Sequence, residues 1–487
     1  MNLSIGRRGL LVLALGLAAL LAGPQSALAQ KLPAYNAKAG MLNVGRDPEH
    51  PDAEIFHVSY TMKGGDPATR PVTFVFNGGP GASSAYLHLA AIGPKTLVTT
   101  GDGSFPAVPA RLEDNPDSWL AFTDLVFIDP MGTGYSRMLP GPDGKPGDPT
   151  PYYAVDSDVN FFAGFIRQWL TVNKRWASPK AVAGESYAGQ RIAGLTRVLA
   201  EDYGINLNRA VLISPAFNVP EIAEPFPPYD LLHAMTVFPT LAATAAYHGR
   251  STITNDAAGH KAAEDFALTD YLTGLATLGR MDPKAQSAFY ARVGGMIGID
   301  PALVAVNRGR VGEAVFANNL LASRGLVLDL YDGTQATEKP MPEKRDEYGA
   351  RPRSLSILTG VLQPPLIDYL QKDLGYVTDR PYLVLSLEVS ALWNRKSTMG
   401  TPSDLEIALA QNTDLKALVV HGYHDLGANY FLSRYVLEQA LVTPSARERV
   451  AFHNYPGGHM FYLNKQSRAE LAADVRKFFE GPYGTAR

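Results

Sequence analysis

The stretch KAVAGESYAGQR, residues 180–191, decides the fold of this chain. Its first residues are small and apolar, as in a short buried strand, and apolar side chains follow Gln190 at helical spacing. Between them lies the run Gly184-Glu185-Ser186-Tyr187-Ala188-Gly189. A strand that turns sharply into a helix needs small residues beside the turn, and the turn presents the serine hydroxyl at the edge of the sheet. The pattern therefore predicts a nucleophile elbow at Ser186, against the alternative of an ordinary strand–helix turn that contains a serine.

Residues 1–29 have the pattern of a secretory signal peptide. Arg7 and Arg8 precede an almost unbroken apolar run over residues 9–22, and Ala27-Leu28-Ala29 has small residues where a signal peptidase reads them. The apolar run is too short to span a bilayer comfortably, so we expect no stable membrane anchor. We expect an exported protein, periplasmic or secreted after cleavage near Ala29.

Composition excludes several classes of function. A formal charge of −3 gives no basic footprint for nucleic acid. The chain has no cysteine, which excludes a thiol nucleophile and a zinc–thiolate site. Serine, histidine and carboxylates are therefore the candidates for chemistry.

Apolar runs that alternate with helical patterns predict the fold class. The runs that predict buried strands are residues 71–76, 124–128, 181–183, 209–213, 415–420 and 449–455. Helical patterns separate most of them, including one over residues 157–176 that Ser157 or Asp158 is expected to cap. This order predicts an α/β protein with a mostly parallel central sheet and helices on both faces. Residues 30–51 read as an extended arm, and residues 53–63 as a strand with one solvated face.

The pattern changes between residues 217 and 352, where helical signals replace strand signals. We expect an all-helical insertion there, with the helix over residues 231–248 broken at Pro239. Core segments 30–216 and 353–487 would flank it. Ligands bind at the carboxyl ends of strands in such sheets, so the insertion is predicted to be a cap over the substrate cleft.

Three loops that follow predicted strands present Ser186, Asp425 and His459, in that order along the chain. A serine hydroxyl needs an imidazole to take its proton, and a carboxylate to fix the imidazole tautomer. Serine, acid, histidine is the order that α/β-hydrolases use. The weaker candidates for base and acid are His421, His424, His453, Asp404 and Asp414.

Two further features suit acyl chemistry on a substrate that carries a carboxylate. The glycine-rich run Asn77-Gly78-Gly79-Pro80-Gly81-Ala82-Ser83-Ser84 follows a predicted buried strand and can serve as an oxyanion hole. Glu185 lies beside the nucleophile, where an anion would oppose the oxyanion. A Glu185 held protonated by its surroundings would instead donate to a substrate carboxylate, with Asn77 alongside. The alternative is a solvated carboxylate.

These residues resemble the serine carboxypeptidase family of α/β-hydrolases. The resemblance rests on residues 77–84, residues 184–189 and Gly457-Gly458-His459-Met460, and residues 129–136 also look like a family loop. It implies Ser186 as nucleophile, His459 as base and Asp425 as orienting acid. It further implies that the backbone N–H groups of Gly79 and Tyr187 form the oxyanion hole. The peptide's terminal carboxylate would bind to Asn77, Gly78 and Glu185. No metal or organic cofactor is implied, and the substrates would be peptides with a free C-terminus.

The chain departs from the family at two positions. Ala82 stands where the family usually has a cysteine, and Ala91 where a second glutamate would usually pair with Glu185. Without that partner, we expect activity that extends toward neutral pH. We expect an exported bacterial member of the family. An esterase or acyltransferase with the same triad, and a catalytically silent binding protein of this fold, remain as alternatives.

Overall fold

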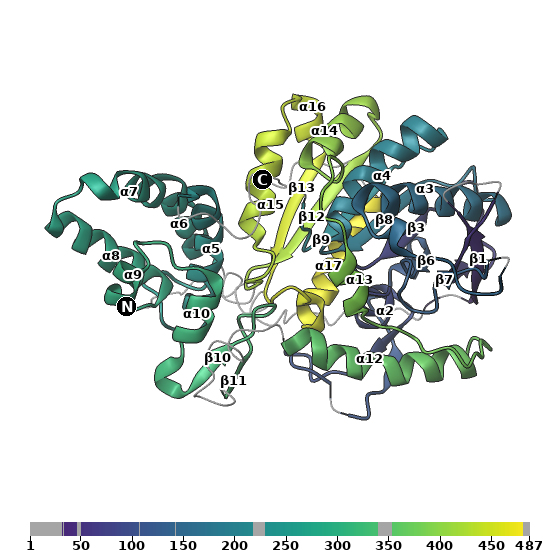
Figure 1. Ribbon diagram of the computed structural model, residues 1–487, viewed down its shortest axis with the longest axis horizontal. Helices are drawn as coiled ribbons and strands as arrows, with labels where there is room; N and C mark the ends of the chain where they lie inside the picture. Colours follow the sequence, from purple (N-terminus) through teal and green to yellow (C-terminus); the bar gives the residue numbers. More distant parts are fainter. Residues whose placement is uncertain are drawn as a thin grey trace, which may run out of the picture.

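The computed structural model describes residues 32, 34–45, 50–106, 108–141, 143–217, 229–338 and 353–480, and the predicted signal peptide lies outside them. A nine-stranded sheet has the order β1-β2-β6-β3-β8-β9-β12-β13, with β7 paired to β2 (Figure 1). Its strands are β1 (Tyr35–Val44), β2 (Ala53–Met62), β3 (Val72–Phe76), β6 (Asp124–Ile128), β7 (Arg137–Met138), β8 (Lys180–Glu185), β9 (Arg209–Ile213), β12 (Lys416–Gly422) and β13 (Val450–Tyr455). Six strands, from β6 to β13 across the sheet, pair in parallel. The predicted mostly parallel sheet is confirmed.

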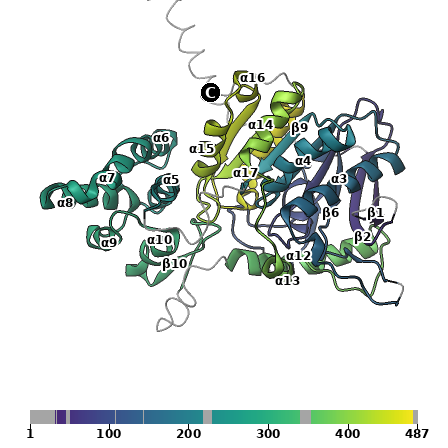
Figure 2. The same cartoon turned by 45° about the horizontal axis from the view of Figure 1, so that its top comes forward.

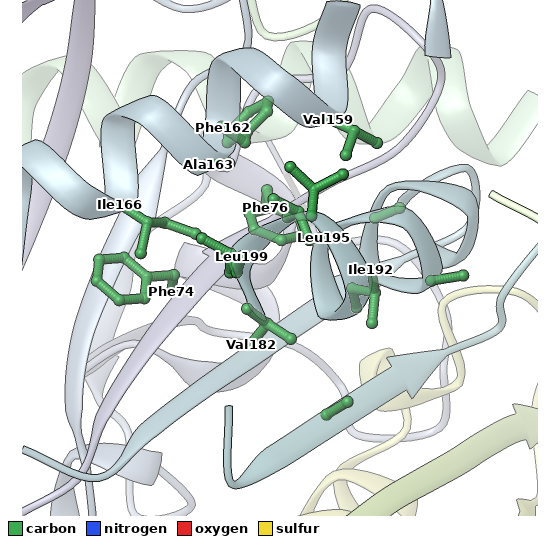
Figure 3. Close-up of a cluster of buried hydrophobic side chains, with 14 of the residues drawn as sticks. Phe74, Phe76, Val159, Phe162, Ala163, Ile166, Val182, Ile192, Leu195 and Leu199 are labelled. Carbon is green, nitrogen blue, oxygen red and sulfur yellow. The ribbon is translucent and has the colours of Figure 1, made fainter. Parts of the chain in front are cut away.

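Helices cover both faces of the sheet, as predicted. On one face α3 (Val155–Val172), α4 (Ala188–Tyr203) and α14 (Pro402–Gln411) share a core with the strands. Figure 3 shows part of this core, where Phe74 and Val182 of the sheet meet Ile166 and Leu199 of the helices. On the other face lie α2 (Ala85–Leu87), the adjoining π-helix η1 (His88–Ile92), α12 (Arg353–Lys372) and α17 (Lys465–Glu480). The shorter elements are β4 (Lys95–Leu97), β5 (Leu112–Asp114), η2 (Trp119–Ala121), η3 (Thr150–Tyr152), α13 (Leu387–Leu392), α15 (Tyr430–Ala440), α16 (Pro444–Arg447) and η9 (Phe461–Leu463).

The edge of the sheet near the N-terminus differs from the prediction. Part of the expected arm is strand β1, which pairs with β2 over its whole length. The signal was an alternation in which Tyr35, Ala37, Ala39 and Met41 pack against the core. Strand β2 has no solvated face, because even His57 and Ser59 are buried.

The insertion after β9 forms a separate layer of helices. These are α5 (Leu231–Tyr247), α6 (Ala257–Phe266), η5 (Ala267–Tyr271), α7 (Leu272–Thr277), η6 (Leu278–Arg280), α8 (Pro283–Ile297), α9 (Pro301–Val306), α10 (Glu313–Asn319) and η7 (Ala322–Arg324). Figures 1 and 2 both show α5 nearest the sheet and α7 and α8 farther away. The layer has its own apolar core, which continues onto Tyr430 and Phe431 of α15.

Two expectations for this insertion are wrong. Helix α5 is not broken at Pro239, because residues 234–245 are all buried and their packing offsets the hydrogen bond that proline cannot donate. The insertion is also not all-helical, since β10 (Leu326–Leu328) and β11 (Ala336–Glu338) form a hairpin. The predicted domain boundaries, at 216/217 and 352/353, adjoin residues 218–228 and 339–352, and these two segments are not among the described residues.

Residues 353–411 carry α12, α13 and α14, which the sequence patterns did not predict. Helix α12 has 20 residues and contains Pro364 and Pro365. Proline inside a sequence segment normally indicates a helix break, so this helix was not predicted. Across the described residues, no helix combines the length and the apolar character that crossing a membrane requires.

Candidate active site

Ser186 lies in a strained turn between β8 and α4. Its φ is 61°, in the left-handed region that residues other than glycine seldom occupy. The Ser186 N–H donates to the Ile213 carbonyl (2.9 Å), and the Ser186 carbonyl accepts the N–H of Gly189 (2.8 Å). Such a conformation costs about 1–3 kcal/mol and persists only where the surroundings enforce it. The predicted strand–turn–helix is confirmed.

The small residues around the turn are required by close packing. A Cβ at Gly184 would lie 2.6 Å from the Cβ of Ala188, and one at Gly189 would lie 2.6 Å from the Cβ of Pro215. Both distances are too short for real side chains. The glycines therefore allow the helix to start directly against the strand.

His459 and Asp425 form a buried hydrogen-bonded pair in the loops after β13 and β12. His459 Nδ1 is 2.5 Å from Asp425 Oδ2. The other Asp425 oxygen accepts the N–H groups of Gly427 (2.9 Å) and Ala428 (2.8 Å), which fixes the carboxylate. Burial alone lowers the pKa of His459, but the carboxylates of Asp425 and Glu185 outweigh it, so this pKa is raised above its usual 6.5.

The end of β9 and the loop after it are hydrogen-bonded both to the elbow and to the loop that carries His459. Ile213, the last residue of β9, accepts the Ser186 N–H, and Ser214 follows it. Ser214 Oγ donates to the His459 carbonyl (2.8 Å). Because β8, β9, β12 and β13 are neighbours in the sheet, their loops bring the serine, acid and histidine to one edge.

The other histidines and aspartates have different surroundings. His453, which the strand alternation predicts to pack on the sheet, stacks on the Tyr455 ring of its own strand with 4.4 Å between the ring centroids. Its side chain is nevertheless 46% exposed and lies beside Asp474 of α17. His421 and His424 are buried, and burial lowers the pKa of each to about 3. Asp404 completes the capping box of α14 with the N-cap residue Thr401, and Asp414 is exposed before β12.

The hairpin of the insertion reaches His459. The His459 N–H donates to the Tyr331 carbonyl (2.5 Å), and the ring centroids of the two residues are 4.7 Å apart. Asp329 in turn accepts the N–H of Tyr331 (2.8 Å) and both the N–H and Oγ of Ser354 at the start of α12 (2.9 Å each). The insertion thus forms one wall around the imidazole.

The glycine-rich loop after β3 lies directly against the elbow. A Cβ at Gly78 would lie 2.6 Å from the Tyr187 nitrogen and 2.9 Å from the Ser186 Cβ. Gly79 has a φ of 103°, which a side chain would strain. This contact sets the backbone of Gly78 next to the Tyr187 nitrogen, where the oxyanion hole is predicted.

Glu185 is buried beside the nucleophile and is hydrogen-bonded at both oxygens. Asn77 Nδ2 donates to Oε2, and the Tyr462 hydroxyl donates to Oε1 at 2.7 Å. Burial raises the pKa of Glu185 to about 7, although His459 and the two hydrogen bonds lower it. A solvated carboxylate is excluded by its 4% exposure.

A buried ion pair supports the loop that carries Asn77. Arg191 Nε is 2.8 Å from Asp158 Oδ2, and Arg191 Nη1 donates to the Asn77 carbonyl at 2.8 Å. The Tyr187 hydroxyl also donates to Asp158. The expectation that Asp158 caps α3 is wrong, because the helix begins at Val155 and Asp158 serves this pair instead.

Fold and site together define a class: the chain has the α/β-hydrolase fold. Its marks are the parallel sheet, the elbow at Ser186, and the acid and histidine in loops after later strands. A crystal structure of Kex1(Δ)p, a prohormone-processing carboxypeptidase from Saccharomyces cerevisiae, is similar with a TM-score of 0.56. The similarity covers 92% of this chain and 91% of that one, at 17% identity.

Sequence comparison finds a similarity to serine carboxypeptidases over part of the chain. Residues 26–235 match the family model Peptidase_S10, serine carboxypeptidase. The chain is 33% identical over 128 residues to a pheromone-processing carboxypeptidase kex1 of Sclerotinia sclerotiorum, and 31% identical over 171 residues to a carboxypeptidase Y homolog of Arthroderma benhamiae. The serine carboxypeptidase-like 36 of Arabidopsis thaliana is 30% identical over 166 residues. These matches cover 26%, 34% and 32% of this chain, and 18%, 31% and 30% of the relatives.

The similarity agrees with the resemblance carried by residues 77–84 and 184–189, which lie in the matched segment. The chain spans less than a third of the length of the relatives it matches. Those relatives are fungal and plant proteins, so they do not support the expected bacterial source.

Sequence reasoning missed three residues that contact the site. Tyr331 arrives from the insertion and Arg191 lies within the elbow helix, and neither has a local signal in the sequence. Tyr462 had one: it follows His459 within the same loop, in the turn η9.

Proposed function

We propose that this chain is a serine carboxypeptidase, which releases C-terminal residues from peptides through an acyl-enzyme. The observation that carries the proposal is the buried Glu185 beside Ser186, at the same sheet edge as the His459–Asp425 pair. An elbow with an acid–histidine pair supports acyl transfer in general. The buried carboxyl favours a substrate with a free terminal carboxylate over an ester.

In the proposed acylation step, Ser186 Oγ attacks the carbonyl carbon of the last peptide bond. His459 Nε2 takes the hydroxyl proton, while Asp425 accepts the Nδ1–H and stabilises the imidazolium. The N–H groups of Gly79 and Tyr187 donate to the developing oxyanion. The imidazolium then gives its proton to the leaving amino group, and the amino acid departs. Water, activated by His459, hydrolyses the acyl-enzyme.

The terminal carboxylate would bind at Glu185, Asn77 and Gly78. A protonated Glu185 donates one hydrogen bond to it, and the second N–H of the Asn77 amide is free for another. The Asn77 amide is held by the Leu87 N–H, which donates to its oxygen (3.1 Å). Such charge-assisted hydrogen bonds place the scissile carbonyl at Ser186 and restrict cleavage to chain ends.

We predict a bell-shaped dependence of kcat/KM on pH, with its maximum near neutrality. His459 must be neutral to accept the serine proton, so activity falls as pH drops through its pKa, which is raised above 6.5. Glu185 must be protonated to bind the carboxylate, so affinity falls as pH rises through about 7. Initial rates across pH 4–10 measure both limbs, and an optimum below about pH 5 would contradict the assignment.

The function is tested with two substrates that differ only at the C-terminus: an N-blocked dipeptide acid and its amide. The proposal expects release of the terminal residue from the acid, with kcat/KM about 10- to 100-fold above that for the amide, the worth of hydrogen bonds to a charged group. A preference for the amide or for simple esters would favour an esterase or acyltransferase. A wild-type protein that a fluorophosphonate does not label would be a silent binding protein.

We also propose that the chain is exported, to a periplasm or to the exterior, after cleavage near Ala29. The apolar segment and the Ala27-Leu28-Ala29 site support this. N-terminal sequencing of the mature protein tests it, and an intact Met1 would contradict it.

A further inference from the structure

Tyr462 makes a contact with Glu185 that the triad does not explain. It lies in the turn η9 after His459, and its side chain is fully buried. Its hydroxyl is 2.7 Å from Glu185 Oε1, while Asn77 occupies Oε2. Each oxygen of the buried carboxyl therefore has one uncharged donor.

We propose that Tyr462 is a positioning residue for carboxylate recognition: its phenol holds Glu185 in place of a second carboxyl, so that a single proton governs the binding of the peptide's C-terminus. The inference deepens the proposed carboxypeptidase function and rests on it. The sequence resemblance implied a second glutamate at position 91, where this chain has alanine. Tyr462 supplies a partner from a different element.

The chemistry of a phenol differs from that of a second carboxyl. Two carboxyls that share a proton repel each other when both are ionised, and that repulsion ties binding to acid pH. A phenol donates to the ionised Glu185 and accepts when its hydroxyl rotates, so it serves either protonation state. Burial, together with Glu185, raises the pKa of Tyr462 well above 10, so the phenol stays neutral where the enzyme would work.

The groups around Glu185 determine in which direction its pKa moves when the Tyr462 hydroxyl is removed. His459 and the donors Tyr462 and Asn77 lower the pKa of Glu185, and Asp425 raises it. Tyr86 of α2 and Tyr331 of the insertion also interact with Glu185, and burial raises the pKa of each phenol far above neutrality. Removing the Tyr462 hydroxyl takes away one donor to the carboxylate. The pKa of Glu185 must then rise.

The test compares the pH dependence of KM for the N-blocked dipeptide acid in the wild type and in Tyr462→Phe. We expect the alkaline limb to move up by about 0.5–1 pH unit, the worth of one hydrogen bond, with kcat nearly unchanged. Glu185→Gln should remove the limb, because an amide does not titrate. Tyr86→Phe is the matched control, since the Tyr86 phenol interacts with Glu185 only electrostatically and its hydroxyl lies 2.8 Å from Thr359 Oγ1. A limb that stays in place in Tyr462→Phe, or moves equally in Tyr86→Phe, overturns the proposal.

A second readout does not need the peptidase activity. The carboxyl stretching band of Glu185, taken as the infrared difference between each protein and its Glu185→Gln counterpart, reports the same titration without substrate. The proposal expects the same upward shift there. A shift without any release of C-terminal residues would refute the proposed function alone, while release without a shift would refute the role of Tyr462.

Discussion

Replacing His459 with alanine is expected to lower kcat/KM for the dipeptide acid by about 10⁴-fold or more. The reason is that Ser186 then has no base to accept its proton, while the Asp425 carboxylate loses its partner. Ser186→Ala should cause a similar loss and abolish fluorophosphonate labelling. The double variant should be no worse than either single one, because the residues act as a unit. Initial rates and labelling measure both effects.

His453→Ala is the matched control for His459→Ala. His453 lies on β13, the strand that leads into the His459 loop, but its side chain is 46% exposed and contacts Asp474 outside the site. An exposed substitution of this kind changes stability by at most about 0.5 kcal/mol, so activity should stay near that of the wild type. A larger loss in His453→Ala than in His459→Ala would contradict the assignment of the base.

Asp158→Asn is expected to lower the free energy of unfolding by about 3–5 kcal/mol, because it leaves the Arg191 guanidinium buried without a counter-charge. Arg191 is only 1% exposed, and it stacks over the Phe162 ring with 4.4 Å to the centroid. It also holds the Asn77 carbonyl, so the surviving folded protein should show a raised KM. Urea unfolding followed by tryptophan fluorescence measures the stability.

The control for Asp158→Asn is the exposed ion pair of Arg197 and Glu201, which lies on α4, the helix that carries Arg191. Its side chains are 39% and 36% exposed, and such pairs contribute about 0–1 kcal/mol. Glu201→Gln should therefore unfold close to the wild type. If Asp158→Asn also unfolds at the wild-type urea concentration, the buried pair does not support the loop as described.

The sequence predicted those parts of the molecule that local pattern determines. Apolar runs located the parallel strands, and Gly184, Ser186 and Gly189 located the elbow, because the turn excludes larger side chains. The chain order of Ser186, Asp425 and His459 selected the residues that the structure gathers at one edge. Their catalytic roles remain proposals.

Features that depend on distant contacts could not be predicted. Helix α5 continues through Pro239 only because the insertion buries it, and Tyr331 reaches His459 only through the fold of a hairpin. Asp158 looked like a helix cap, yet its partner Arg191 belongs to another helix. Strand β1 could have been predicted from its local pattern, because apolar and polar residues alternate along it. The glycine and proline residues in and around this segment favoured the incorrect prediction of an extended arm.

The most direct test of the account is the acid-to-amide ratio of kcat/KM for the dipeptide pair, measured in the wild type and in Glu185→Met. Methionine fills the buried site without a hydrogen-bonding group, while Ser186, His459 and Asp425 stay intact. The account predicts that the ratio of about 10 to 100 collapses toward one, because acid hydrolysis falls and amide hydrolysis persists. An unchanged ratio in Glu185→Met would contradict it, because chain-end specificity would then come from elsewhere.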